Sequence, residues 1–161
     1  MDIKEIALCG VMAALVCVAT LLVQVPVPAT RGYINVGDAL IMVAALSFGP
    51  LVGGFAGGVG SALADVLGGW AHWAPFTLVI KGVEGLLAGL LAKRPSSKPH
   101  LLIPAWAVGC GEMVLGYFIV ETVLYGMGAA LVELPGNLFQ MVVGGVVGIP
   151  VSRVVKKWMK A

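Results

Sequence analysis

Long runs of apolar residues dominate this sequence and are separated by short polar or proline-containing stretches. The runs predict six helices, at residues 6–25, 37–48, 51–67, 76–92, 101–124 and 134–155. About 20 apolar residues cross the hydrocarbon core of a bilayer as a helix, and all but the second run approach that length. We therefore predict an all-α integral membrane protein, a bundle of six transmembrane helices forming a single domain over residues 1–161.

Composition supports lipid as the main solvent. Of the 161 residues, 60% are hydrophobic and 11% are charged, whereas soluble domains carry about 25% charged residues. The net charge of +2 arises from short basic clusters between apolar runs, so no nucleic-acid partner is predicted. Cys9, Cys17 and Cys110 lie in apolar stretches, and their spacing suits neither a disulfide nor a metal site.

The basic residues indicate an orientation. Eight of the ten Lys and Arg residues fall on one side of a six-span arrangement, together with both termini: Lys4, Lys93, Arg94, Lys98, Arg153, Lys156, Lys157 and Lys160. By the positive-inside rule, that side and both termini are cytoplasmic. Arg31 and Lys81 lie in or near the opposite half and need another explanation.

Polar side chains at membrane depth form faces on several predicted helices. A charge at the bilayer centre costs about 2.5–3.5 kcal/mol on insertion scales, so such groups usually face a cavity or a partner. Helical spacing gives three faces: Thr77, Lys81 and Glu84; Tyr117, Glu121 and Tyr125; Glu133, Asn137 and Gln140. Further polar groups in the same outer half are Asn35, Asp38, Ser61 and Asp65. Together they predict one outward-opening cavity covered by the loops that carry Tyr33 and residues 70–73.

Each of these groups also has a purely structural interpretation. Asp38, Asp65 and Glu133 lie near predicted helix ends, where an interfacial position explains them equally well. Lys81 and Glu84 suit a structural ion pair, and His72 suits a surface loop. Glu112, deep in the other half, fits hydrogen bonding between helices. The convergence of polar groups from five segments is what favours a binding cavity.

Small residues form stripes on two predicted helices. Gly53, Gly57 and Ser61, flanked by a second stripe that includes Gly54 and Gly58, predict close packing of helices in lipid. No Gly-Lys-Ser/Thr follows, so this is not a phosphate-binding loop. On the first helix, Gly10, Ala13 and Ala14 lie among small residues. That stripe suits either docking of another membrane subunit or packing within the bundle.

Four stretches resemble the substrate-binding S components of energy-coupling factor (ECF) transporters, in the riboflavin-transporter-like branch. They are residues 32–40 (GYINVGDAL), 48–53 (FGPLVG), 60–69 (GSALADVLGG) and 73–82 (WAPFTLVIKG). The resemblance is strong over residues 33–89 and otherwise general, in length and six-span layout. It implies a six-helix bundle in a prokaryotic plasma membrane, with an outward-facing vitamin site covered by the loop at 29–36.

The resemblance also implies partners. Small residues of the first helix would contact a transmembrane coupling subunit, a role assigned here to Gly10, Ala13 and Ala14. Two ATPase subunits would supply energy, consistent with the lack of a nucleotide-binding motif in this sequence.

The residues and the resemblance together give a set of substrate-binding candidates: Tyr33, Asn35, Asp38, Asp65, Trp70, His72, Trp73, Lys81, Glu84, Glu121, Tyr125 and Asn137. The aromatic rings suit stacking on a flat heterocycle, and a riboflavin-like ligand is the first choice. Pantothenate, thiamine and cobalamin precursors remain alternatives. Acids outnumber Lys81, which disfavours anionic pantothenate. No catalytic residue, metal ligand or cofactor is predicted.

Two other classes of function fit the sequence less well than a binding subunit. An intramembrane enzyme would use Asp65, His72 and Glu121, but the sequence has no Gly-x-Ser-x-Gly and no His-Glu-x-x-His motif. A self-sufficient secondary transporter usually carries an inverted repeat, which is not evident here.

Overall fold

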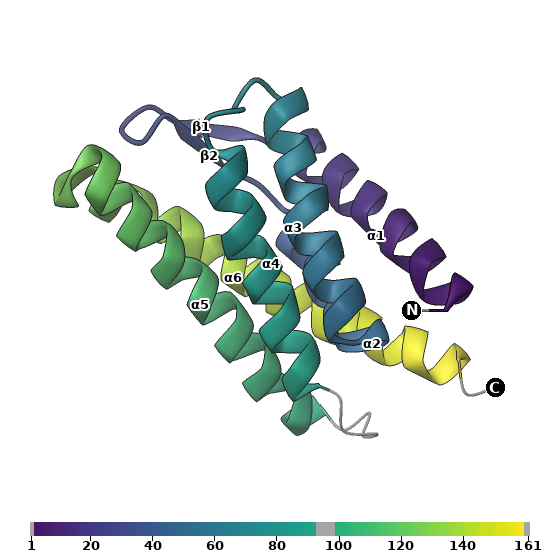
Figure 1. The fold of residues 1–161 in the computed structure, drawn as a ribbon. Coiled ribbons are helices and arrows are strands. Elements are labelled where there is room, and N and C mark those ends of the chain that lie inside the picture. Colours follow the sequence, from purple (N-terminus) through teal and green to yellow (C-terminus); the bar gives the residue numbers. More distant parts are fainter. Residues whose placement is uncertain (1, 93–98, 160–161) are drawn as a thin grey trace.

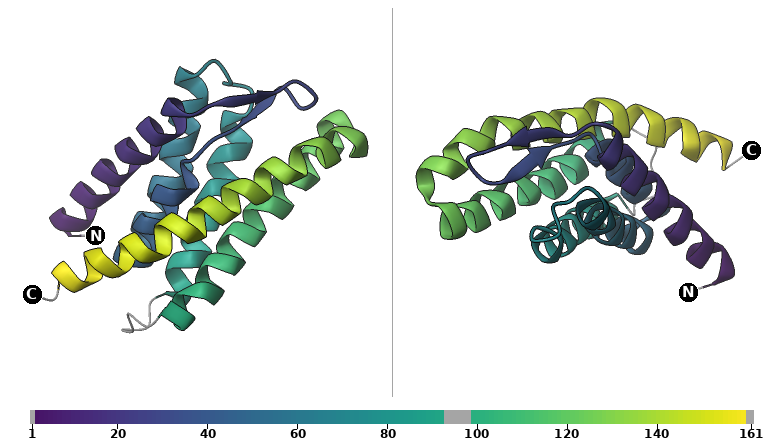
Figure 2. Two further views of the ribbon diagram at one scale, coloured as in Figure 1. Left: turned by 180° about the vertical axis from the view of Figure 1, so that it is seen from behind. Right: turned by 90° about the horizontal axis from the view of Figure 1, so that it is seen from above.

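The computed structural model describes residues 2–92 and 99–159. Its helices are α1 (Ile3–Leu22), α2 (Asp38–Phe48), α3 (Pro50–Leu67), α4 (Ala74–Leu91), α5 (Pro99–Tyr125) and α6 (Met127–Trp158). The strands β1 (Val25–Val27) and β2 (Gly32–Ile34) form a hairpin between α1 and α2. Successive helices run back and forth, so the hairpin covers one end of the bundle and both termini lie at the other (Figures 1 and 2).

Five of these helices are long and apolar enough to cross a membrane, which supports the predicted all-α membrane class. The exception is α2, whose 11 residues give a length of about 16 Å. It lies inside the bundle and packs against each of the other five helices. Ile41, Met42 and Ala44 of α2 are fully buried. The core of this protein is therefore built around one short helix surrounded by longer ones.

The outer surface of the long helices is apolar. Large side chains such as Leu22 on α1, Val123 on α5 and Val146 on α6 are among the most exposed of the described residues. Exposed side chains of this kind would be costly in water but are compatible with lipid tails. The distribution of a soluble protein is therefore reversed: apolar side chains cover the surface, and polar groups gather in the interior.

The first helix begins and ends earlier than predicted. Asp2 caps α1, and Glu5 bonds back to the Asp2 backbone in a capping box, so the helix starts at Ile3. Its predicted end at residue 25 is wrong, because Val25 already belongs to β1. Val25 pairs with Ile34 and Val27 with Gly32. Prolines before and after Val27 favour extended backbone, which explains why this stretch forms a strand.

The sixth helix begins seven residues earlier than predicted, at Met127. Gly126 has a φ of 90°, which suits glycine, and it alone separates α6 from α5. Residues 129–132 are apolar, but the glycines at 126 and 128 and the proline at 135 favour a later start in sequence. The structure continues the helix from residue 127 through the second glycine and the proline, and it buries Glu133. Pro135 and Pro150 are accommodated inside the helix.

The predicted close packing of glycine stripes is confirmed at the contact between α3 and α4. A Cβ on Gly57 would overlap the backbone oxygen of Lys81, and one on Gly85 would overlap the backbone of Gly53. These glycines let the two helix backbones touch. The contact also sets the height of Lys81 relative to α3.

We expect Gly57→Ala to lower the thermal stability of the detergent-solubilised protein, by about 1–3 kcal/mol, because α4 must move away from the new methyl group. Gly10→Ala is the matched control, since a Cβ there meets nothing within 4 Å. Both substitutions gain the same helix propensity. Equal melting temperatures for the two variants would show that the α3–α4 contact tolerates a methyl group.

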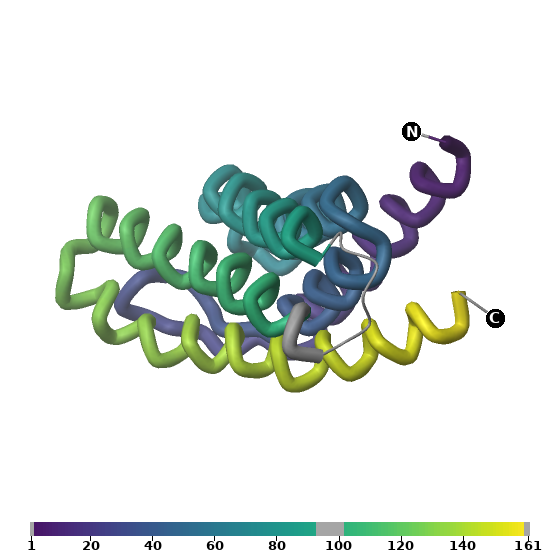
Figure 3. Tube along the Cα trace, turned by 90° about the horizontal axis from the view of Figure 1, so that it is seen from below, coloured from purple at the N-terminus to yellow at the C-terminus, as the bar shows by residue number. Residues whose placement is uncertain are grey.

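Basic residues gather at the end of the bundle that carries the termini. Lys4 lies in the first turns of α1, and Arg153, Lys156 and Lys157 lie in the last turns of α6. Figure 3, viewed from this end, shows these two helix ends diverging from each other. The other four basic residues assigned to this side, at positions 93, 94, 98 and 160, lie outside the described residues.

Candidate functional site

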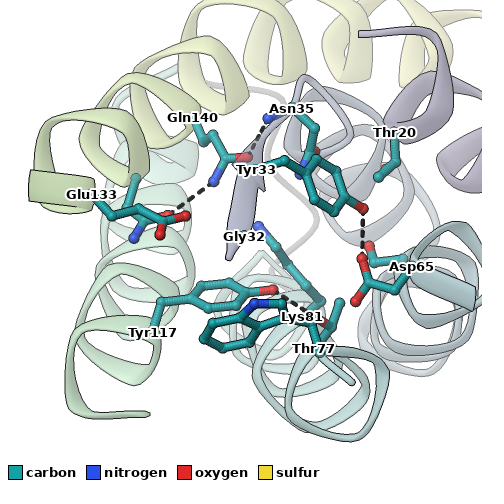
Figure 4. A pocket seen from close by; sticks show the side chains of 13 residues that line it. Thr20, Gly32, Tyr33, Asn35, Asp65, Thr77, Lys81, Tyr117, Glu133 and Gln140 are labelled. Atoms are coloured by element: carbon teal, nitrogen blue, oxygen red, sulfur yellow. Dashed lines mark hydrogen bonds between the residues drawn. The ribbon is translucent and has the colours of Figure 1, made fainter. Parts of the chain in front are cut away.

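A polar pocket lies beneath the hairpin, at the end of the bundle opposite the termini (Figure 4). It contains about 390 Å³ of empty space, part of it open to solvent. Elements far apart in sequence contribute its walls: α1, the hairpin, and the facing parts of α3, α4, α5 and α6. The lining residues are Thr20, Gly32, Tyr33, Asn35, Ser61, Asp65, Trp73, Thr77, Lys81, Tyr117, Glu133, Asn137 and Gln140.

One wall presents a carboxylate to the pocket. The Tyr33 hydroxyl donates to Asp65 Oδ1 at 2.5 Å, and Asp65 is 2% exposed. Burial and, next, the Asp65 charge raise the pKa of the Tyr33 phenol, so Tyr33 stays protonated and donates. Asp65 Oδ2 is buried and accepts no well-formed hydrogen bond from the described residues, although the Thr77 side chain lies beside this carboxylate. An unpaired buried carboxylate oxygen is costly, so this atom suits a donor supplied by a ligand.

Aromatic side chains join the hairpin to the helices. Trp73 is buried, lines the pocket and donates from Nε1 to the backbone oxygen of Arg31 at 3.1 Å. Its ring lies about 6 Å from those of Tyr117 and Tyr125, centroid to centroid. Tyr117 in turn donates to Thr77 Oγ1 at 3.1 Å. The Trp73 ring is tilted by 60° and 38° against those of Tyr117 and Tyr125, so the rings form a partly polar aromatic cluster at the base of the hairpin.

A buried ionic cluster forms the floor. Lys81 is 2% exposed and pairs with Asp38 of α2, while Glu84 Oε2 lies 3.5 Å from its Nζ. Cys110 of α5 donates to Glu84 Oε1 at 3.2 Å. Asp38 and Glu84 are both fully buried. The sequence favoured Glu84 as the structural partner of Lys81 because it lies one helical turn away, but Asp38 is the closer one.

The wall formed by α6 is built from amides. Asn137 Nδ2 donates to Glu121 Oε1 at 3.2 Å, and Gln140 Nε2 donates to Asn137 Oδ1 at 3.1 Å. Gln140 Oε1 then accepts from the backbone N–H of Asn35 at 2.8 Å, where the hairpin leads into α2. All four residues are buried. Figure 4 shows Gln140 and Asn35 side by side, joined by this hydrogen bond.

A second hydrogen bond holds the hairpin to α6. Thr30, in the turn between the strands, donates to Glu133 Oε2. Glu133 is 5% exposed and lines the pocket. The hairpin is thus attached to α3 through Tyr33, to α4 through Trp73, and to α6 through Thr30 and Asn35.

The structure brings half of the twelve predicted substrate-binding residues to the pocket wall: Tyr33, Asn35, Asp65, Trp73, Lys81 and Asn137. The other six lie close behind the wall or away from it. Asp38 and Glu84 contact Lys81, Glu121 contacts Asn137, and Tyr125 lies beside Trp73.

The remaining two belong to the connection between α3 and α4. The Trp70 ring lies 5.2 Å from that of Tyr33, and the exposed His72 lies 3.1 Å from the backbone oxygen of Arg31. Both support the hairpin from outside the pocket.

Seven lining residues were not among the sequence candidates: Thr20, Gly32, Ser61, Thr77, Tyr117, Glu133 and Gln140. Four of them lie on the polar faces that helical spacing revealed, and Ser61 was among the further polar groups of the same half, so that signal was present. Thr20 is a polar residue near the end of an apolar helix, and its buried Oγ1 has no hydrogen-bond partner among the described residues. Gly32 carries no side-chain signal at all.

The small residues of α1 divide between two faces. Gly10 and Ala14 are exposed, whereas Ala13 is buried against α3, where a Cβ on Gly60 would meet its backbone oxygen at 2.6 Å. Ala13 therefore packs within the bundle in this structure. Gly10 and Ala14 leave part of the outer face of α1 smooth.

Comparison with known proteins places this architecture among membrane transporters. Residues 1–157 match the family of the ECF-type riboflavin transporter, S component, and the chain belongs to that family. The match covers nearly the whole chain and confirms the family expected from sequence. The protein is thus a multi-pass prokaryotic membrane protein and a component of a vitamin-type transporter, which supports a non-enzymatic function.

Individual relatives agree with the family. The chain is 32% identical over 158 residues to the thiamine precursor transporter HmpT of Lactococcus lactis, covering 97% of this chain and 90% of the relative. It is 49% identical over 142 residues to an uncharacterized protein of Pyrococcus woesei, covering 88% and 95%. A UPF0397 protein of Streptococcus agalactiae is 35% identical over 92 residues, covering 57% and 50%.

Proposed function

We propose that this protein captures a flat, uncharged nitrogen heterocycle in the pocket beneath the hairpin, and that the ligand is an aminopyrimidine of the thiamine-precursor type. The observation that carries the proposal is the arrangement of the two facing walls. Asp65 Oδ2 is an unpaired buried acceptor on one side, and three amide side chains line the other. An aminopyrimidine has amino N–H donors for the first wall and ring nitrogen acceptors for the second.

The charges favour a neutral ligand. The only cation lining the pocket among the described residues is Lys81, and its charge is matched by Asp38 and Glu84. Asp65 and Glu133 add two acids to the walls. An anion such as pantothenate would meet these carboxylates without a spare positive charge, which supports the preference already expected from the sequence.

The size of the pocket bears on the choice between a thiamine precursor and riboflavin. The empty space in and around the pocket is about 390 Å³. Part of that space is open to solvent. A single ring therefore needs less movement of the hairpin than a tricyclic flavin with its ribityl chain. The name of the Lactococcus lactis relative supports the same choice.

The test is a titration of purified protein in detergent with an aminopyrimidine thiamine precursor, thiamine, riboflavin and pantothenate. We expect submicromolar binding of the aminopyrimidine and at least tenfold weaker binding of the others, about 1.4 kcal/mol per factor of ten. Tighter binding of riboflavin would show that the ligand belongs to the flavin class and not to the aminopyrimidines. Failure of all four ligands to bind folded protein would contradict capture of this class of compound.

The proposal includes the orientation and the partners. Basic residues at the terminal end support a cytoplasmic position for both termini, with the pocket facing out. The exposed Gly10 and Ala14 support docking of a coupling subunit on α1, with two ATPases supplying energy. Gly10→Leu should abolish uptake by the assembled transporter while leaving ligand affinity unchanged. Normal uptake by this variant would show that the coupling subunit docks elsewhere. A C-terminal tag that is accessible from outside the cell would show that the orientation is the opposite of the one proposed.

A further inference from the structure

The amide wall of the pocket is one end of a directional hydrogen-bond relay. The relay runs from the Asn35 backbone N–H through Gln140 and Asn137 to Glu121, which lies behind the pocket wall. A backbone N–H can only donate, so Gln140 must present its oxygen to the hairpin. Gln140 then has only its NH2 group for Asn137, and Asn137 must present its oxygen in return.

The far end of the relay requires an acceptor. Once Asn137 Oδ1 accepts from Gln140, its Nδ2 faces Glu121 and needs a hydrogen-bond acceptor there. The Glu121 carboxylate supplies one and is fully buried. Rotating either amide by 180° would set donor against donor or acceptor against acceptor. The two ends of the relay therefore enforce the same orientation of both amides.

We propose that Glu121 is a positioning residue that determines ligand specificity through this relay. Each amide NH2 group carries two N–H bonds, and the relay uses one of each. Both side chains line the pocket, so the second N–H of each is directed to a ligand that accepts hydrogen bonds. Closure of the hairpin and the donor character of this wall thus depend on an acceptor at position 121. The ligand part rests on the proposed function, whereas the relay rests on the contacts alone.

An exchange of the side chains at positions 140 and 121 tests the relay without changing the composition of the buried polar groups. In Gln140→Glu, the new carboxylate still accepts from Asn35 but can no longer donate to Asn137, so two acceptors oppose each other. Adding Glu121→Gln restores every bond with Asn137 rotated, because the amide now at position 121 donates and the carboxylate now at position 140 accepts. The Glu121→Gln single variant is the conservative control, since its oxygen still accepts from Asn137.

Thermal stability is measured first, in detergent and without ligand. We expect Gln140→Glu to lower the melting temperature and the exchange variant to recover most of the loss. An exchange variant no more stable than Gln140→Glu would overturn the relay. Should Gln140→Glu fail to fold, Glu121→Leu against Glu121→Gln gives the same test, with Leu, which has no acceptor, as the less stable of the two.

Ligand affinity is the readout that a purely structural role would not change. The exchange variant has lost the donors of Gln140, so we expect aminopyrimidine binding to stay at least tenfold weaker than wild type although stability has recovered. Recovery of both the melting temperature and the ligand affinity in the exchange variant would contradict a role of the relay in ligand specificity. If wild-type protein binds no aminopyrimidine, the proposed ligand class fails, while the melting temperatures of the exchange variants still decide on the relay.

Discussion

Replacing Lys81 with Met should destabilise the protein by about 3–5 kcal/mol, because the substitution leaves a buried carboxylate without its counter-ion. Asp38 and Glu84 are both fully buried, and Lys81 is the cation that contacts them. Met matches the length of the Lys stem and keeps most of its packing, so the loss reports the charge. Thermal unfolding in detergent measures the effect, and ligand binding should fail only as the folded fraction falls.

The double variant Lys81→Met with Asp38→Asn separates charge from shape. It removes the pair together, and replacing both partners of a buried ion pair is far less costly than removing one. We expect it to regain part of the stability lost in Lys81→Met, because Glu84 still lacks its counter-ion. Two results would contradict this account: a single variant as stable as wild type, or a double variant as unstable as the single one. The first would instead indicate that Lys81 acts mainly as a ligand contact.

Replacing Asp65 with Asn should weaken aminopyrimidine binding about 10- to 150-fold, the equivalent of roughly 1.5–3 kcal/mol for a hydrogen bond to a charged group. Asn keeps one oxygen for the Tyr33 hydroxyl. It replaces the unpaired Oδ2 by an NH2 group, which would oppose the amino group of the ligand. Calorimetric titration of folded protein measures the change.

Glu112→Gln is the matched control for this experiment. Glu112 is a partly buried carboxylate on α5 that does not line the pocket, so the same chemical change there should leave affinity unaltered. Equal affinities for wild type and Asp65→Asn would remove Asp65 from the site. An equal loss in both variants would indicate a general effect of removing an intramembrane acid.

Local pattern was sufficient for the class of protein and for much of the site. Apolar runs require only the bilayer as solvent to become helices, and a spacing of three or four residues places polar side chains on one face. Hence the polar faces around Lys81, Glu121 and Asn137 were identifiable, as was the glycine contact at Gly57. The end of α1 was missed because a short apolar strand continues the apolar run of the helix, and the start of α6 was missed because Gly126 and Gly128 resemble a loop in sequence.

Tertiary packing decided which polar groups meet. Asp38 and Lys81 are 43 residues apart, and Thr30 and Glu133 are 103 apart. No periodicity joins such positions, because their distance depends on how closely α2, α4 and α6 approach one another. Packing therefore made Asp38 the main partner of Lys81 in place of the nearby Glu84. Packing also put Gln140 on the pocket wall and Glu121 behind it. The sequence does not distinguish these two positions, because they lie on different helices whose contact forms only when the bundle packs.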